Sequence, residues 1–236
     1  MLIERNNAER AKTAQQMTPL WDPLTDGQRL LLASQTELFE FSRGDVIYHI
    51  GDDPLYLMYL LCGRVTLYRH GLPGQRQQVV RMVEPGGIFG YRAAFASEQQ
   101  STTAIASEPL RVAAVPMSLV FHLTWENSAF AMLFIRELSQ LLGTSLKRTI
   151  SMTQKHIRGR LAEILLVVKD KYGFLEDGQT LAIYVSREDL ASIANMTTSN
   201  AIRTLSAFAQ EGLVAIEGRR LRYLDIPALE RISQLG

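Results

Sequence analysis

Three polar side chains recur on one side of a short segment near the C-terminus of this 236-residue chain. Ser199, Arg203 and Ser206 stand at positions i, i+4 and i+7, which is the spacing of one face of an α-helix. An arginine can pair with both O6 and N7 of guanine, and serine hydroxyls can bond to phosphates or base edges. The pattern predicts a helix whose outer face reads DNA, with Arg203 as its base reader.

Further polar groups flank this segment. Ser186 and Asp189 have the spacing of a capping box, and Thr197 is a suitable cap for the next helix. Besides Arg203, the residues predicted to contact bases or phosphates are Ser186, Arg187, Thr198, Ser199, Asn200, Arg219 and Arg220. The alternative for Arg203 is a solvated or phosphate-binding side chain. For Arg219 and Arg220 the alternative is a solvated hairpin.

The elements that position these groups follow one another between residues 185 and 225. Two short helix patterns come first, and a hairpin that turns at Gly218 follows. This order is typical of a winged helix-turn-helix, which places its second helix in the major groove. Leu181, Ile183 and Val185 alternate with other residues, which predicts a strand leading into the first helix.

The region upstream has a different residue pattern. Short β-branched and aromatic runs between residues 39 and 115 are separated by glycines, which predicts a small antiparallel barrel or jelly roll. Residues 18–36 are expected to be helical, and residues 117–125 form a second short helix. The polar residues 1–17 are expected to be frayed or to form a short appended helix.

A long helix is predicted from Ser128 to about Gln154. Its apolar seam steps by four and three residues, as in a coiled coil; the seam consists of Ala131, Ile135, Leu138, Leu142, Ser145, Thr149 and Met152. Ile135, Leu138, Leu142, Ser145 and Thr149 are therefore the predicted dimer interface. A long helix buried within one monomer is the alternative.

Bulk composition excludes several classes of protein. The 25 Lys and Arg residues balance 24 Asp and Glu residues, so contact with DNA must depend on local placement of charge. Cys62 is the single cysteine, which excludes an iron–sulfur cluster. The sequence has neither a signal peptide nor a membrane span, so we expect a cytoplasmic protein without a membrane partner. No cluster with metal-ligand spacing occurs between residues 39 and 115, so neither a catalytic nor a metal site is predicted.

From about residue 18 to residue 230 the chain resembles the CRP/FNR family of bacterial transcription regulators. The resemblance rests on FSRGDVIYHIGD, LCGRVTLYRHG, EPGGIFGYRAAF, the helix from Ser128 and the stretch from Val185 to Asp225. It implies an α+β fold with an N-terminal double-stranded β-roll (jelly roll) sensor domain, a long dimerisation helix and a C-terminal winged helix-turn-helix. The corresponding domains are residues 1–127, 128–154 and 155–236. It also implies a homodimer on a near-palindromic double-stranded operator, and RNA polymerase as a partner if the protein is an activator.

The chain departs from the family pattern in its expected effector pocket, which comprises Gly90, Tyr91, Arg92, Gln100, Ser101 and Ser145. Cyclic-AMP-binding members carry a Glu where Tyr91 stands and an Arg-Ser pair where Gln100 and Ser101 stand. Tyr91 cannot accept a pair of ribose hydroxyls as a carboxylate can, and Gln100 cannot neutralise a phosphate. These replacements argue against a cyclic nucleotide. Arg92 could substitute, although its spacing in the sequence differs.

The remaining departures concern haem and the operator. A haem would need an axial ligand, for which His49, His70, His122 and His156 are the scattered candidates. Many members carry Glu where Ser199 stands, so the operator is expected to differ from the usual half-site.

Three hypotheses of function follow. The first is a homodimeric DNA-binding regulator whose β-roll senses an effector and repositions the recognition helices. The second is a small-molecule- or haem-binding sensor that acts through protein contacts instead of DNA. The third is an enzyme, against which the lack of a catalytic cluster argues.

Overall fold

The computed structural model describes residues 7–69 and 78–235, which divide into two compact units, Met1–Leu142 and Gly143–Gly236. His70, a candidate haem ligand, lies outside the described residues, as does the side chain of Met152. Among the helices of the described ranges, none is long and apolar enough to cross a membrane.

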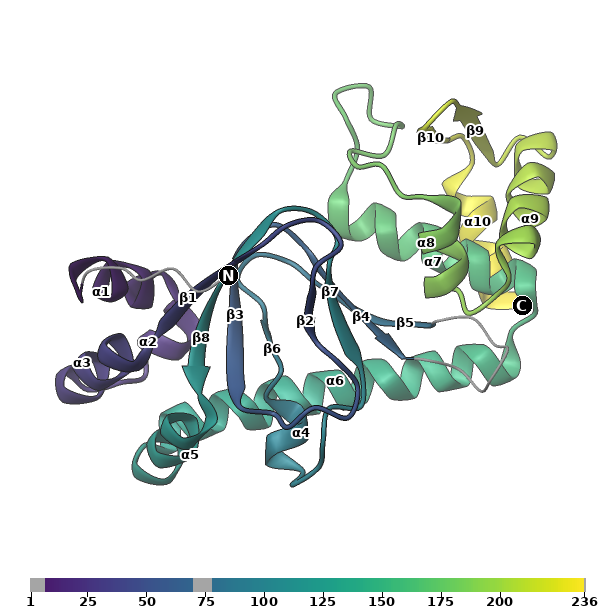
Figure 1. Ribbon diagram of the computed structural model, residues 1–236. Helices are drawn as coiled ribbons and strands as arrows, with labels where there is room; N and C mark the ends of the chain where they lie inside the picture. The colour runs from purple at the N-terminus through teal and green to yellow at the C-terminus, as the bar shows by residue number, and fades with distance from the viewer. Residues whose placement is uncertain (1–6, 70–77, 236) are drawn as a thin grey trace. The chain divides into compact units, whose positions relative to one another are not determined.

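The first unit is built on two four-stranded antiparallel sheets with the strand orders β1-β8-β3-β6 and β2-β7-β4-β5 (Figure 1). The strands are β1 (Glu37–Phe41), β2 (Val46–Tyr48), β3 (Tyr56–Cys62), β4 (Val65–Arg69), β5 (Gln78–Val83), β6 (Ile88–Phe89), β7 (Thr103–Ala106) and β8 (Leu110–Pro116). Side chains from both sheets, including Leu60, Val65 and Val112, form one buried cluster. The predicted β-roll is confirmed.

Three short helices precede the roll. They are α1 (Asn7–Gln16), α2 (Thr18–Trp21) and α3 (Asp26–Gln35). The helical structure expected over residues 18–36 is present as two helices, α2 and α3, because Thr25 caps a new helix in a capping box with Gln28. Figure 1 shows the three helices gathered beside β1 and β8. The Tyr59 hydroxyl of β3 donates a 3.1 Å hydrogen bond to the Gln16 carbonyl, which fixes the end of α1.

Two helices follow the roll, namely α5 (Met117–Glu126) and α6 (Ser128–Gln154), the latter with the predicted bounds. Asn127 separates them, and its side-chain oxygen accepts a 3.0 Å hydrogen bond from the Phe130 N–H. Phe130 and Phe134 are buried against the roll. An apolar stripe of α6 is exposed, and it consists of Met132, Ile135, Leu142, Leu146 and Ile150. Only Ile135 and Leu142 of this stripe belong to the predicted seam, and Leu138 of that seam packs partly against the core.

The second unit packs three helices and a hairpin around α7 (Ile157–Tyr172). The other elements are α8 (Arg187–Ile193), α9 (Thr198–Gln210), β9 (Val214–Glu217), β10 (Arg220–Tyr223) and α10 (Ile226–Leu235). Leu161 and Leu165 of α7 share a buried cluster with Leu205 and Phe208 of α9. The buried Tyr223 hydroxyl donates a 2.7 Å hydrogen bond to the Leu165 carbonyl, which joins the hairpin to α7.

The strand predicted over residues 181–185 is wrong. This part of the chain forms only isolated bridges, from Phe174 to Leu181 and from Thr180 to Arg222. The Leu181 N–H donates to the Leu221 carbonyl at 2.9 Å, after which the segment leaves the hairpin. Alternation here reflects burial, since Leu181, Ile183 and Val185 line an apolar pocket next to β9 and β10.

Asp177 organises the loop between α7 and this segment. Its carboxylate accepts hydrogen bonds from the Thr180 hydroxyl and from the N–H groups of Gln179 and Thr180, the last at 2.8 Å. These bonds favour the charged form and lower the pKa of Asp177 from 3.8 to about 2.

We therefore expect the loop to lose this support in acid. A depressed folded-state pKa stabilises the fold above the ordinary value of 3.8, and the contribution is lost as the pH falls towards 2. A titration of the Asp177 carboxyl carbon by NMR measures the midpoint directly. A midpoint near the ordinary value would contradict the prediction, and Asp177→Asn should remove the acid-dependent change in the Thr180 amide signal.

Candidate nucleic-acid interface and effector cassette

The two helices of the second unit begin as the sequence predicts. The Ser186 hydroxyl accepts a 3.0 Å hydrogen bond from the Asp189 N–H, and the Asp189 carboxylate accepts one in return from the Ser186 N–H. Thr197 caps α9 by accepting from the Asn200 N–H at 3.2 Å. Both caps satisfy amide groups that the first turn of a helix leaves unpaired. They fix where each helix starts, and thereby which side chains stand in its first turn.

The outward face of α9 carries the predicted reading residues. Ala201, Leu205 and Phe208 are buried. On the opposite side, Ser199, Arg203 and Ser206 are exposed as expected. Ile202 is 49% exposed on the same side and was not predicted, although its spacing from Ser199 and Ser206 by three and four residues marks it as part of the face.

Arg203 is held in place by its own helix. One of its guanidinium nitrogens donates to the side-chain oxygen of Asn200, one turn earlier. The resemblance stated above implies a carboxylate four residues before this arginine, and Ser199 stands at that position. Asn200 therefore supplies the orienting acceptor, a role that the sequence alone did not assign.

A second arginine fixes the far end of α9. Arg158 of α7 forms a two-pronged ion pair with Glu211, the C-cap residue of α9, with one N–O distance of 2.7 Å. Its guanidinium also lies 4.9 Å from the centroid of the Phe208 ring. These contacts raise the pKa of Arg158 and lower the pKa of Glu211, in each case mainly through the hydrogen bond between them. Both ends of the helix are thus anchored, so its exposed face has a defined direction.

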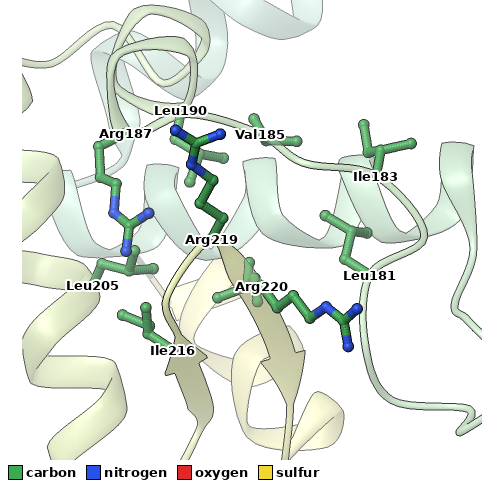
Figure 2. A pocket seen from close by; sticks show the side chains of 10 residues that line it. Leu181, Ile183, Val185, Arg187, Leu190, Leu205, Ile216, Arg219 and Arg220 are labelled. Carbon is green, nitrogen blue, oxygen red and sulfur yellow. The ribbon is translucent and has the colours of Figure 1, made fainter.

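The hairpin β9–β10 forms the wing beside these helices. Glu217 pairs with Arg220 across a turn of Gly218 and Arg219, and Gly218 has a φ of 61°, which favours glycine. Arg219 lies in the turn as predicted, whereas Arg220 is already the first residue of β10. Figure 2 shows the apolar pocket beneath the wing. Its apolar lining consists of Leu181, Ile183, Val185, Leu190, Leu205, Ile216 and Leu221.

Three arginines also line this apolar pocket, namely Arg187, Arg219 and Arg220 (Figure 2). Arg187 donates a 3.4 Å hydrogen bond to the Gly218 carbonyl, which links the first turn of α8 to the wing turn. The Arg219 guanidinium lies 5.6 Å from the ring centroid of Tyr184, an exposed residue that was not predicted to take part. The three cations form a local positive surface in a unit whose charges otherwise balance.

Gly90, Tyr91, Arg92, Gln100 and Ser101 are the residues of the expected effector pocket that lie in the first unit, and they are called the effector cassette. Hydrogen bonds hold several of them to one another and to neighbouring loops. Gly90 has a φ of 83°, and a Cβ atom there would lie 2.9 Å from the Tyr56 carbonyl, so only glycine fits. The Gly90 carbonyl accepts a 2.8 Å hydrogen bond from the buried Gln100 side chain. The Gln100 backbone bonds to Gly51 and Asp52. Gln100 is therefore a structural tie between loops.

Arg92 and Ser101 come together in space despite their separation in the sequence. An Arg92 guanidinium nitrogen donates to the Ser101 hydroxyl. Burial raises the pKa of the Tyr48 hydroxyl. The charge of Arg92 opposes this rise, as do a hydrogen bond with Thr102 and the charge of Arg81. Spacing in the sequence argued against Arg92 as a substitute, but the fold brings Arg92 of α4 (Arg92–Phe95) next to Ser101, which precedes β7.

Tyr91 is turned away from solvent and into an aromatic cluster. Its ring lies 5.5 Å from that of Phe134 on α6 and 6.2 Å from that of Phe95. Burial raises the pKa of Tyr91 well above its ordinary value, and the Glu137 carboxylate raises the pKa further. Glu137 of α6 pairs with Arg81 of β5 at 3.0 Å. Arg81 acts electrostatically on the Tyr91 hydroxyl, which has no partner at hydrogen-bonding geometry within the described residues.

Replacing Tyr91 with phenylalanine should therefore not destabilise the protein. A buried hydroxyl without a partner costs free energy, so its removal should leave the free energy of unfolding unchanged or raise it by up to about 2 kcal/mol. Chemical denaturation of the full-length protein measures this difference. Tyr91→Leu is the matched control, and it should be destabilised through lost aromatic packing. A clear loss of stability in Tyr91→Phe would instead mean that the hydroxyl is bonded.

The candidate haem ligands of the described ranges remain scattered. His49, His122 and His156 are exposed, and His122 lies 3.4 Å from Glu126. Within the described ranges, no three His, Cys, Asp or Glu side chains gather as metal ligands would. Ser145 on α6 is exposed, and its carbonyl accepts from the Thr149 hydroxyl at 3.0 Å.

Two family models match the chain. A cyclic nucleotide-binding domain matches residues 38–124, and a Crp-like helix-turn-helix domain matches residues 159–232. Together they cover the β-roll and the unit that contains α8, α9 and the wing.

Curated relatives match over most of their length. The transcriptional regulatory protein btr of Bordetella pertussis is 26% identical over 83% of this chain and 81% of its own. The transcriptional regulator LdrP of Thermus thermophilus is 27% identical over 81% of this chain and 94% of its own. Among solved structures, FixK2 from Bradyrhizobium japonicum has a TM-score of 0.71 and 20% identity, covering 84% of this chain and 96% of its own. The last likeness shows the fold.

Proposed function

Because the chain belongs to the CRP/FNR family of DNA-binding transcription regulators, we propose that it binds a near-palindromic operator in the cytoplasm as a homodimer. In this proposal residues 1–127 sense an effector, residues 128–154 join the two subunits and residues 155–236 read DNA. The observation that carries it is the outward face of α9, where Arg203 is already oriented by Asn200. Beside this face, Arg187 of α8 and the wing residues Arg219 and Arg220 line one pocket.

The DNA-reading part of the proposal assigns different tasks to the two sets of groups. Arg203, Thr198, Ser199 and Asn200 stand in or near the first two turns of α9, the part of a recognition helix that meets base edges. Ser186, Arg187, Arg219 and Arg220 meet phosphates, because they lie at a helix start and on the wing. The near-neutral net charge of +1 makes this local grouping the main source of attraction to DNA.

The exposed stripe of α6 supports the homodimer. Ile135, Leu142, Leu146 and Ile150 are each more than half exposed. A contiguous apolar stripe at heptad-like spacing is typical of a helix that packs against another helix. Two copies related by a twofold axis would cover the same residues on both sides and present two α9 helices to a twofold-related pair of half-sites.

The cassette supports an effector other than a cyclic nucleotide. Tyr91 points into the aromatic core and offers no acceptor for ribose hydroxyls, and Gln100 already bonds to Gly90. The charged donor left at the cassette surface is Arg92 together with Ser101. We expect an effector with an anionic or strongly accepting group at this position.

Coupling to DNA would pass through two contacts between the cassette region and α6. Tyr91 packs on Phe134, and Arg81 of β5 pairs with Glu137 one turn later. An effector that moves Arg92 acts on the residue next to Tyr91, so it can bias the arrangement of α6 and of the helices that follow. If the protein activates transcription, RNA polymerase is its further partner.

Selection of bound DNA from a random library by the full-length protein tests the proposal. We expect enrichment of a two-part, near-palindromic sequence and a native mass of two chains plus one duplex. Failure to enrich any sequence would overturn it and favour a sensor that acts through protein contacts. Absorption and native mass spectra of freshly purified protein test the effector, since haem or a retained ligand would be seen directly.

A further inference from the structure

An isoleucine stands among the polar side chains on the outward face of α9. Ile202 is 49% exposed, although its helix buries Ala201, Leu205 and Phe208 on the other side. A single exposed apolar residue is ordinary on a protein surface. Its position here is not neutral, since it is the direct neighbour of Arg203 and shares a face with Ser199 and Ser206. A β-branched residue also adds nothing to helix propensity at an exposed site.

The major groove offers one kind of apolar group to such a side chain. Each base pair presents donors and acceptors there, and only thymine adds a methyl group, at C5. Ser199 provides no carboxylate to accept from the amino group of cytosine. The exposed face of α9 therefore combines a donor for guanine, two hydroxyls and one branched hydrocarbon.

We propose that Ile202 is a specificity-determining residue that recognises the C5-methyl group of a thymine near the guanine read by Arg203. The inference rests on the proposed function and names one feature of the operator. Adjacent helix residues differ by about 1.5 Å along the axis and about 100° around it. Ile202 therefore reaches a base pair next to the guanine contacted by Arg203, or the one beyond it.

The test replaces thymine with deoxyuridine, which removes the methyl group and leaves the base-pairing and groove hydrogen-bonding groups unchanged. The starting duplex is the sequence that the full-length protein enriches from a random library. Each thymine of one half-site is replaced in turn, and binding is measured by fluorescence anisotropy for the wild type and for Ile202→Ala.

We expect one position at which deoxyuridine weakens wild-type binding by about fourfold, the equivalent of one buried methyl group. At that position Ile202→Ala should bind the thymine and deoxyuridine duplexes equally. Val167→Ala is the matched control, because Val167 is a similarly exposed branched residue on α7 of the same unit. This variant should keep the fourfold preference for thymine.

Two results would overturn the inference. In one, no thymine position shows a preference that Ile202→Ala removes. In the other, Ile202→Ala weakens binding to both duplexes equally and keeps the preference. Thermal unfolding of Ile202→Ala verifies that the variant is folded. Failure of the proposed function has a different signature, because the wild type would then enrich no sequence.

Discussion

Replacing Arg203 with alanine is expected to abolish sequence-specific DNA binding and to leave weak, salt-sensitive binding in place. A bidentate arginine–guanine pair contributes about 1–3 kcal/mol of discrimination. The proposed homodimer would use the residue twice, so the free energy of operator binding should weaken by about 2–6 kcal/mol, a drop in affinity of roughly 30-fold or more. Non-specific binding depends mainly on phosphate contacts, which Arg187, Arg219 and Arg220 would still make.

The measurement compares operator and unrelated duplexes over a range of salt concentrations. Arg203→Lys should be nearly as defective for the operator as Arg203→Ala, because an ammonium group cannot form the two-pronged contact. Arg231→Ala removes the same charge from an exposed position on α10 and should bind normally. If Arg203→Ala lost operator and non-specific binding equally, Arg203 would be a phosphate contact instead of a base reader.

In the proposed homodimer, replacing Leu142 with aspartate is expected to separate the two subunits and thereby to remove the paired contacts with the two half-sites. Leu142 is 61% exposed on the apolar stripe of α6. Burying a leucine contributes about 2 kcal/mol, and a twofold axis brings both copies of the substitution into one interface. The dimer should therefore lose at least about 4 kcal/mol, a rise of roughly a thousandfold in its dissociation constant.

Sedimentation equilibrium of the full-length protein measures this change, and an operator gel shift follows its effect on binding. Lys147→Asp places the same carboxylate on the same helix, about 140° around its axis from Leu142. This control should remain dimeric and bind the operator. A dimer that persists in Leu142→Asp would show that the exposed stripe of α6 is not the subunit interface.

The sequence predicted the helix caps and the bounds of α6, because these features depend on residues close together in the chain. The capping box of Ser186 and Asp189 and the cap at Thr197 depend on residues three apart, so their spacing alone identifies them. The bounds of α6 follow from its apolar periodicity and the break at Asn127. The polar pattern also predicted the outward face of α9, but it does not include the apolar Ile202.

Contacts between distant segments could not be read in this way. Arg92 and Ser101 meet because the fold places α4 beside the start of β7, and spacing in the sequence carries no such information. Leu181, Ile183 and Val185 alternate as a strand does, yet their period comes from lining the pocket beneath the wing. The carboxamide of Asn200 orients Arg203 from one helical turn away. Both side chains have many other rotamers, so the sequence alone does not predict this contact.

The contact between Asn200 and Arg203 also bears on the kinetics of binding. A free arginine side chain samples many rotamers, and fixing it costs up to about 2 kcal/mol. Because Asn200 holds Arg203 before DNA arrives, much of this ordering takes place when the protein folds. Operators that differ at the guanine should then have similar association rate constants and differ mainly in their dissociation rate constants.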